Sequence, residues 1–472
     1  MMRGVGTSDA TWVDVDVKDE QAMSNLSWEE RLNARVLAPA QAGGVRYRLF
    51  IVLLGAVVAW GFVAFVYQLK DGLYVTDMRD RISWGLYIAA LIFFMGISMA
   101  GTFISAILRA ASADWRTPIT RMAEAVTVAA LISGALFIIV DMGRPDRLYN
   151  FYFYGNWQSP MMWDMIAITI YLTASVTFLL VPMVPDLAYF RDRLDGRVAR
   201  WRILVYDSLA LGWEGNERQH REIHKAIGVL MIVIIPVAAS VHTMLAWIFA
   251  TTSRVSWDST ILGLFFVTGA MYSGIATVII LLAVVRRVYH LEEYITARHF
   301  KNLAYLMAAG GVLMLYGNAS EYIPKGFKMD EEEAHAFRQL FVEDFAPFFW
   351  FYFFGGLIFP LVVIAFKRSR TIPGLVIASI FVNVGMFIER YFIVVAGLRV
   401  PLLDYEPSSY SPTWVEWSIF ASGCAGFTLL LTLFTRVFPI LSVWEMKEEH
   451  EYEEPSFVSV REGVSVEEGS SA

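Results

Sequence analysis

The sequence predicts an all-α polytopic membrane protein with ten transmembrane helices. Apolar residues make up 57% of the 472 residues and charged residues only 18%, which is too apolar for a soluble protein of this length. Apolar stretches of about twenty residues or more recur along the chain, and each is long enough to cross a hydrocarbon core of about 30 Å. The predicted spans are residues 50–69, 82–108, 122–141, 161–184, 226–250, 259–285, 302–322, 345–366, 372–396 and 413–435.

The basic residues between the spans predict how the helices are oriented. The connections after the second, fourth, sixth and eighth spans hold eighteen Lys and Arg residues, whereas the connections after the odd-numbered spans hold about ten. Basic residues are enriched in cytoplasmic loops. We therefore expect both termini in the cytoplasm and the connection after the third span on the outer side.

The ten-helix domain is predicted to occupy residues 46–440, between two tails. Residues 1–45 are polar, and Ser27 followed by Glu three residues later fits a capping box that begins a short amphipathic helix. We expect this helix to lie on the membrane surface or against a partner, and Pro39 to end it. Residues 441–472 are rich in Glu and Ser without an apolar period, which predicts an acidic, disordered tail.

A faint repeat of four helices predicts how the spans are grouped. Span three ends in a polar corner at Asp141, and span seven is expected to end in one at residues 318–322. Two spans after each corner, His242 and Glu389 lie within apolar helices. Four helices per repeat preserve the orientation, so the sequence predicts two four-helix bundles with one flanking helix on each side.

The corner after the third span is the first candidate for a functional site. Gly143 and Pro145 end the helix, so Asp141 lies in its last turn. The helix dipole and the membrane edge both disfavour a charge on Asp141, whereas Arg144 and Arg147 favour one. A carboxyl held between these influences is suited to taking up and releasing protons.

Ionisable side chains inside the spans are the other candidates, because each costs about 2.5–3.5 kcal/mol on insertion scales. His242 is the only histidine well inside a span, and a neutral imidazole accepts a proton near neutral pH. Asp164 opens the fourth span on the same side as Asp141. Expected contributors to a binding region near that side are Arg144, Asp146, Arg254, Asp258 and Trp163. Candidates for a proton path are Glu124, Glu321, Glu389 and Arg390.

Structural roles are the alternatives for these residues. The charges at the outer side would then be surface salt bridges, and Trp163 would belong to the interfacial aromatic belt. The adjacent Glu389 and Arg390 would neutralise each other.

The residue inventory argues against several cofactors and reactions. Cys424 is the only cysteine, which excludes an internal disulfide and an iron–sulfur cluster or zinc site built on this chain's thiolates. A membrane haem usually takes two buried histidines, so none is expected with His242 alone. His220 and His224 are four residues apart but flank a charged helix start, and no metal is expected there. Phosphate-binding loops and hydrolase motifs are absent, and we expect a lipid bilayer rather than a nucleic acid around the chain.

The ten-span layout, the Asp-x-Gly-Arg-Pro-x-Arg corner at residues 141–147 and the lack of haem ligands resemble the NrfD/polysulfide reductase family of membrane subunits, over roughly residues 45–440. Within it, the N-terminal extension, the acidic tail and the size resemble the quinol-binding membrane subunit of bacterial alternative complex III. The resemblance implies a subunit of a respiratory or photosynthetic complex in the bacterial inner membrane, without a redox centre of its own, that oxidises menaquinol near the outer face. It also implies three kinds of partner: an outer iron–sulfur subunit, multihaem c-type cytochromes and a second NrfD-like membrane subunit.

Three functions therefore stay open. In the first, His242 and either Asp141 or Asp164 take the protons of a quinol, while the partner takes its electrons. In the second, the chain is a structural or proton-path sister subunit without a quinol site. In the third, it is a secondary transporter, which would need broken helices near the membrane midplane. The buried ionisable residues lie mostly nearer one face, which favours the first function over transport.

Overall fold

The computed structural model describes residues 23–41, 44–252, 254, 256–329, 331–400 and 408–453. These residues form helices and no strand, and ten of the helices are long and apolar enough to cross a membrane, which confirms the predicted fold class. The ten are Val45–Asp71 (α3), Leu86–Ala110 (α4 to α5), Asp114–Asp141 (η3 and α6), Pro160–Leu194 (α8 to α9), Glu217–Ala250 (α11), Leu262–Val288 (α12), Ala297–Lys328 (α13), Ala346–Ala365 (α15 to α16), Ile372–Arg399 (α17) and Trp414–Val437 (α18).

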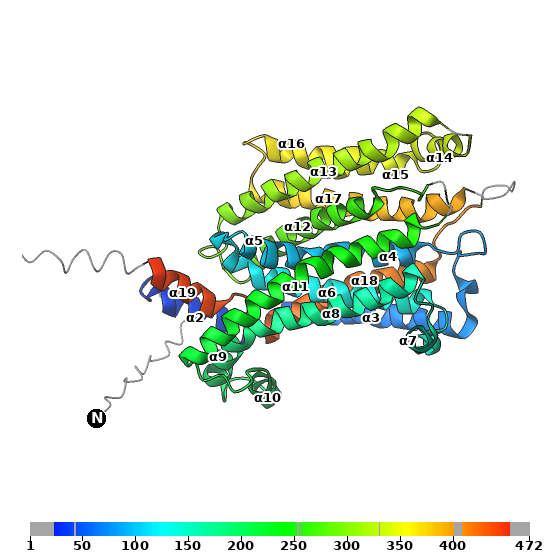
Figure 1. Ribbon diagram of the computed structural model, residues 1–472. Helices are drawn as coiled ribbons and strands as arrows, with labels where there is room; N and C mark the ends of the chain where they lie inside the picture. Colours follow the sequence, from blue (N-terminus) through cyan, green and yellow to red (C-terminus); the bar gives the residue numbers. More distant parts are fainter. Residues whose placement is uncertain are drawn as a thin grey trace, which may run out of the picture.

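The long helices lie side by side, with short helices at their two ends (Figure 1). At one end lie α7 (Tyr149–Tyr154) and α14 (Glu331–Phe341), and we call it the α7 end. At the other lie α2 (Trp28–Gln41), α10 (Arg200–Leu209) and α19 (Val443–Glu453), and we call it the α19 end. The first and last of the described helices, α2 and α19, are therefore at the same end, as an even number of crossings requires.

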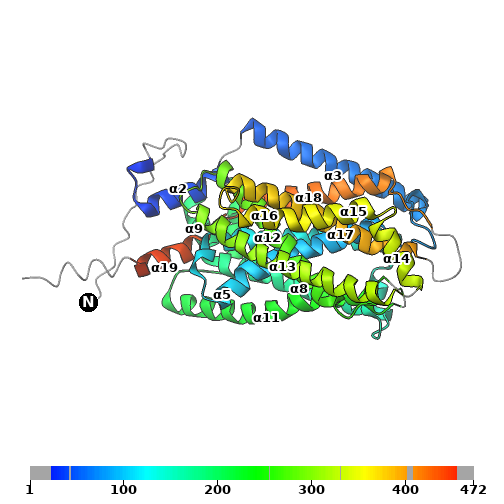
Figure 2. The same cartoon turned by 90° about the horizontal axis from the view of Figure 1, so that it is seen from above.

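Helix contacts run both within and between the two halves of the chain. α4 contacts α6, α8 contacts both α6 and α11, and α12 contacts α13 and α17. α4 also joins the halves through contacts with α12 and α17, and α3 packs along α18 at the edge of the molecule (Figure 2). The division into two four-helix bundles with flanking helices stays a prediction.

Gly101 brings α4 and α6 together, which matters for the site below. A Cβ atom at this position would lie 2.4 Å from Thr127 Oγ1 and 2.8 Å from Ala123 O, so only glycine allows this approach. The Gly101 N–H donates to Thr127 Oγ1 at 2.7 Å. Directly after it, residues Thr102–Ile107 of the same helix take the π-helical form (η2). Such segments are rare and frequently mark functional sites.

Several helices are longer than the apolar runs predicted. α11, for example, begins at Glu217 rather than near residue 226, because apolar residues mark only the hydrocarbon region and a helix continues through polar turns beyond it. The expected end of span seven at residues 318–322 was also wrong, since α13 continues to Lys328. Asn318 is buried and its side chain donates to Tyr352 Oη at 2.8 Å, so its polarity serves a helix contact rather than a helix end.

The N-terminal helix differs from its prediction in where it ends. Pro39 does not end it, since α2 continues to Gln41. The carbonyl oxygens of Pro39 and Ala40 accept hydrogen bonds from Arg436 and Arg202 at 3.3 and 2.8 Å. α2 packs against α18 and α19 of its own chain, and its position on the membrane surface stays a prediction. Residues 1–22 lie outside the described part.

The prediction of a disordered C-terminal tail was wrong for its first part, because residues 443–453 form α19. Glu445 is 7% exposed and accepts from Arg109 at 2.9 Å and Arg116 at 3.4 Å. Nearby, Arg121 pairs with Asp186 at 2.8 Å. These charges hold the helix against the α19 end and explain why an acidic segment orders. Residues 454–472 lie outside the described part.

Candidate functional site

His242 is held by backbone carbonyl oxygens on both sides of its ring. It is 2% exposed and lies eight residues before the end of α11, about 12 Å from the α7 end at ~1.5 Å per residue. Nδ1 lies 2.8 Å from Ala238 O and Nε2 lies 2.9 Å from Met95 O. A neutral imidazole has one N–H and can donate to only one of these oxygens, whereas a protonated ring donates to both. The surroundings of His242 can therefore hold a proton, and a hydroxyl would have to displace one carbonyl to reach the ring.

Tyr171 on α8 lies next to His242 and brings a buried hydroxyl group to this region. The two rings meet edge-on with centroids 6.3 Å apart. Tyr171 Oη lies 3.0 Å from Ser98 O and 3.0 Å from Thr102 Oγ1, on α4 and at the start of η2. Ser98 Oγ donates at 2.6 Å to Met95 O, the oxygen that also faces His242. These hydroxyl groups form one buried polar cluster in the middle of the molecule.

The π-helical segment carries this polarity towards the α19 end. Ser105 Oγ donates to Glu124 Oε1 of α6 at 2.5 Å, while Glu124 Oε2 is buried and has no hydrogen-bond partner among the described residues. The sequence pattern predicted a role for Glu124 but not for the hydroxyl groups of α4 and η2 that lie between Glu124 and His242. A signal was present, because Ser98, Thr102 and Ser105 are spaced by four and three residues and so share one helix face.

Asp164 is buried in α8 without a partner for one carboxyl oxygen. The residue is 4% exposed, and Oδ1 has no hydrogen-bond partner among the described residues. Seven residues separate it from Tyr171, so the two lie on one face of α8, with Asp164 about 10.5 Å nearer the α7 end at ~1.5 Å per residue. Leaving a buried acceptor unsatisfied costs about 1–3 kcal/mol or more, so this carboxyl is placed to receive a donor.

Asp141 is the last residue of α6, and its Oδ1 is also buried without a partner among the described residues. Its surroundings include α3 and α4: Gln68 donates to Val140 O at 2.8 Å and accepts from Tyr87 Oη at 2.6 Å. Asp141, Asp164 and His242 thus lie on three helices of the first half. Among the described residues no hydrogen bond joins any two of the three.

The other residues predicted for the binding region all lie near the α7 end, but in separate groups. Arg144 and Asp146 pair at 2.9 Å with about 60% of each side chain exposed, and this hydrogen bond lowers the pKa of Asp146. Arg254 donates to the carbonyl oxygens of residues 398 and 400 at 3.4 and 3.3 Å. Asp258 lies 3.5 Å from a lysine of α13, and Trp163 donates to Trp157 O at 2.6 Å. The alternative interpretation as surface pairs describes Arg144 and Asp146 well.

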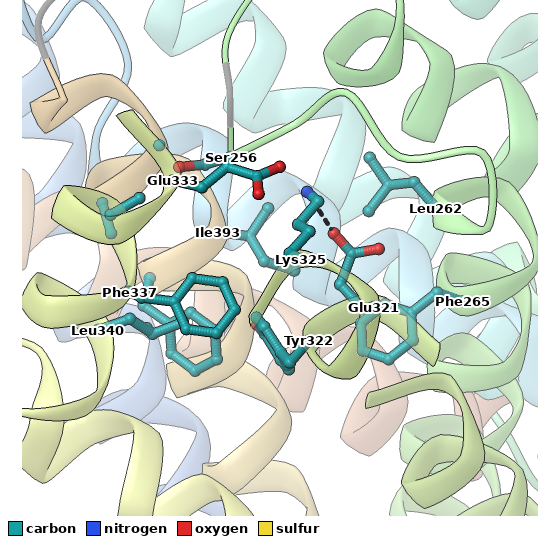
Figure 3. A pocket seen from close by; sticks show the side chains of 14 residues that line it. Ser256, Leu262, Phe265, Glu321, Tyr322, Lys325, Glu333, Phe337, Leu340 and Ile393 are labelled. Carbon is teal, nitrogen blue, oxygen red and sulfur yellow. Dashed lines mark ion pairs between the residues drawn. The ribbon is translucent and has the colours of Figure 1, made fainter. Parts of the chain in front are cut away.

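The remaining proton-path candidates lie in the second half of the chain. Glu389 and Arg390 form an ion pair with at most 3% of either side chain exposed, so the alternative that these neighbours neutralise each other holds. Glu389 Oε1 is nevertheless buried without a partner among the described residues. Glu321 pairs with Lys325 at 2.7 Å, near the α7 end (Figure 3).

No group of three or more His, Cys, Asp or Glu side chains in the described ranges is arranged to hold a metal ion. His220 and His224 instead face the carboxylate of Glu448 at 3.7 and 3.5 Å.

Comparisons with known proteins place the chain in a family. It is 30% identical to a putative dimethyl sulfoxide reductase membrane subunit of Halobacterium salinarum over 50% of this chain, a match that spans about half (51%) of that relative's length. It is 24% identical to a selenate reductase subunit of Mesobacillus selenatarsenatis, over 86% of this chain and 96% of that one. It is 22% identical to the Hdr-like menaquinol oxidoreductase integral membrane subunit of Archaeoglobus fulgidus, over 80% and 89%. The family model described as "Polysulphide reductase, NrfD" matches residues 74–401, well over half of the chain, and this multi-pass membrane protein therefore belongs to that family.

Proposed function

We propose that this chain is the quinol-binding membrane subunit of an electron-transfer complex of the alternative complex III type, and that it oxidises menaquinol near its α7 end. Family membership and the menaquinol named in one relative's description support this function. The observation that carries the site is the pair of buried carboxyls at this end, Asp141 and Asp164, each with an oxygen that has no partner among the described residues. A quinol brings two hydroxyl donors to such acceptors.

The reaction divides between this chain and its partner. Oxidation of one quinol to the quinone breaks two O–H bonds and releases two protons and two electrons. Asp164 and Asp141 accept the protons as general bases, which needs only hydrogen-bond reach to the hydroxyls. The two electrons leave to a redox centre of an iron–sulfur partner protein. Arg144, Asp146, Arg254, Asp258 and Trp163 form the polar rim of the site.

His242 is the proposed second proton acceptor, after the two carboxylates. It takes a proton when Nε2 leaves Met95 O, and the protonated ring then donates to both carbonyl oxygens beside it. The hydroxyls of Tyr171, Thr102 and Ser105 extend this path to Glu124. In the second half of the chain, Glu321, Glu389 and Arg390 are the proposed residues of another proton path.

The proposed setting is the bacterial inner membrane, with the α7 end outside and both termini in the cytoplasm. The iron–sulfur subunit would then cover the α7 end, with multihaem c-type cytochromes and a second NrfD-like membrane subunit in the same complex. The positive-inside rule supports this orientation, because the more basic connections lie at the α19 end.

The test is menaquinol oxidation by the purified complex carrying Asp164→Asn or Asp141→Asn. Each change keeps the shape of the side chain and removes the base, so we expect turnover to fall by at least about 10²-fold with assembly intact. Asp207→Asn is the control, because this aspartate is 67% exposed on α10 at the opposite end. Turnover unchanged in both variants would make the chain a sister subunit without a quinol site, and substrate uptake by the isolated chain in liposomes would assign it to the transporters.

A further inference from the structure

A pocket of about 70 Å³ lies near the α7 end between α12, α13, α14 and α17 (Figure 3). None of the proposed quinol bases lines it. Its apolar wall includes the rings of Phe265, Tyr322, Phe337 and Phe392, and its polar side chains include Glu321, Lys325 and Glu333. An apolar pocket with a few convergent polar groups is the usual form of a small-ligand site.

Carboxylates outnumber ammonium groups around this pocket. Lys325 Nζ lies 2.7 Å from Glu321 Oε1 and 3.5 Å from Asp258 Oδ1, so one cation serves two carboxylates. Glu333 of α14 adds a third, and its Oε2 is buried with no hydrogen-bond partner among the described residues. Figure 3 shows Glu321 and Glu333 entering from different helices with Lys325 between them. Three carboxylates against one ammonium favour a second cation.

The volume limits what that cation is. At roughly 30 Å³ per water, about 70 Å³ holds two waters, and it is less than half of the ~150 Å³ cavity that takes up benzene. A quinone ring is therefore too large, whereas a primary ammonium on a two-carbon chain fits. The aromatic faces on the wall stabilise such a cation through cation–π contacts.

The position of the pocket indicates where the ammonium comes from. Apart from Ser256 and the residues of α14, its lining belongs to the first turn of α12 and the last two turns of α13 and α17. We infer that these ends of membrane-crossing helices lie at the depth of lipid headgroups. On the same stretch of α13, Ile323 and Phe327 are 68% and 90% exposed and provide an apolar track for acyl chains. Lys328, one residue further on, is exposed and can face a phosphate.

We propose that this pocket binds a primary alkylammonium group, delivered by the ethanolamine headgroup of a phospholipid. The ammonium donates to Glu333 of α14 and to Glu321 of α13, and so ties α14 to the transmembrane helices. A free amine offers the same chemistry, and a trimethylammonium group is too large for the pocket.

The experiment compares lipids retained by the purified complex, by native mass spectrometry, after reconstitution in nanodiscs of phosphatidylglycerol mixed with either phosphatidylethanolamine or phosphatidylcholine. We expect phosphatidylethanolamine to be retained about tenfold better than phosphatidylcholine. Glu333→Gln should abolish this preference, since one charge-assisted hydrogen bond corresponds to about a tenfold difference in affinity. Glu331→Gln is the matched control, because it makes the same change on an exposed position of α14 outside the pocket.

A third arm uses phosphatidylglycerol alone with added ethanolamine. Thermal stabilisation that depends on Glu333 would support the ammonium site with a free amine as its source. Equal retention of the two zwitterionic lipids, or equal effects of Glu333→Gln and Glu331→Gln, would overturn the proposal and leave a water-filled pocket. Neither outcome depends on quinol oxidation, so the proposal fails or stands separately from the proposed function.

Discussion

Removing the carboxylate of Glu445 should release α19 from the membrane domain. Glu445→Ala leaves Arg109 and Arg116 with side chains only 16% and 12% exposed and without this counter-charge. Breaking a buried pair by removing one partner costs about 3–5 kcal/mol. At about 1.4 kcal/mol per factor of ten, we expect the hydrogen-exchange protection of residues 443–453 to fall by roughly 10²- to 4 × 10³-fold.

The same contact should be sensitive to acid. Burial raises the pKa of Glu445. The charges of Arg109 and Arg116 and the hydrogen bond from Arg109 lower it by more than burial raises it, so the pKa lies below the ordinary value of 4.5. A carboxyl with a depressed pKa stabilises the folded state above its unfolded value and loses that contribution as the pH falls through the folded value. α19 should therefore stay docked at neutral pH and release below about pH 4.5, the ordinary value.

Glu448→Gln is the control, because this glutamate is 37% exposed and faces His220 and His224 at 3.7 and 3.5 Å. Exposed pairs contribute about 0–1 kcal/mol, so protection should change by less than about tenfold. Equal protection in Glu445→Ala and the wild type would refute the assignment of α19 docking to this buried ion pair.

Two further predictions concern the helix core and the proton path. Gly385→Ala should lower the midpoint of thermal unfolding, at a cost of about 1–3 kcal/mol, because its Cβ would lie 2.6 Å from Gly356 Cα, where α17 crosses a second π-helical segment, Phe351–Ile358 (η6). At Gly426 an added Cβ meets no atom beyond its own stretch of helix within 4 Å, counting the described residues only. Gly426→Ala should therefore leave the midpoint unchanged or raise it slightly, and equal losses in the two variants would contradict this packing argument. Tyr171→Phe removes a hydroxyl from the proposed path between His242 and Glu124, so the number of protons exchanged at the α19 end per quinol oxidised, measured in vesicles, should fall while turnover is largely kept. An unchanged proton count would remove Tyr171 from the path.

The membrane class and the helices followed from the sequence, because apolar runs and helix-ending residues act locally. Ten spans were predicted, and ten candidate membrane helices are present in the described residues. Asp141 was placed at the end of the third span from Gly143 and Pro145 alone, and α6 ends there. The corner also led to the family, which the match over residues 74–401 confirms.

The roles of individual polar residues could be predicted less well, because a side chain's partner depends on how the helices are rotated against one another. Nothing in the α11 sequence shows that both ring nitrogens of His242 face carbonyl oxygens, one of them on α4. The pairing of Asp258 with Lys325 joins residues that are far apart in the chain. α19 was missed for the same reason, since the partners of its buried Glu445 are Arg109 and Arg116, far away in the chain.

That this chain crosses the membrane, where its ten apolar helices lie and that His242, Asp164 and Glu389 stand inside them could all be predicted from the sequence. Each of these properties depends on residues within one or two helical turns. The packing of the helices against one another then fixes which buried groups have partners and which, like Asp141 and Asp164, keep an oxygen without one among the described residues. Placement inside an apolar span can be read along one helix, whereas a hydrogen bond between helices needs two side chains to meet within about 3 Å.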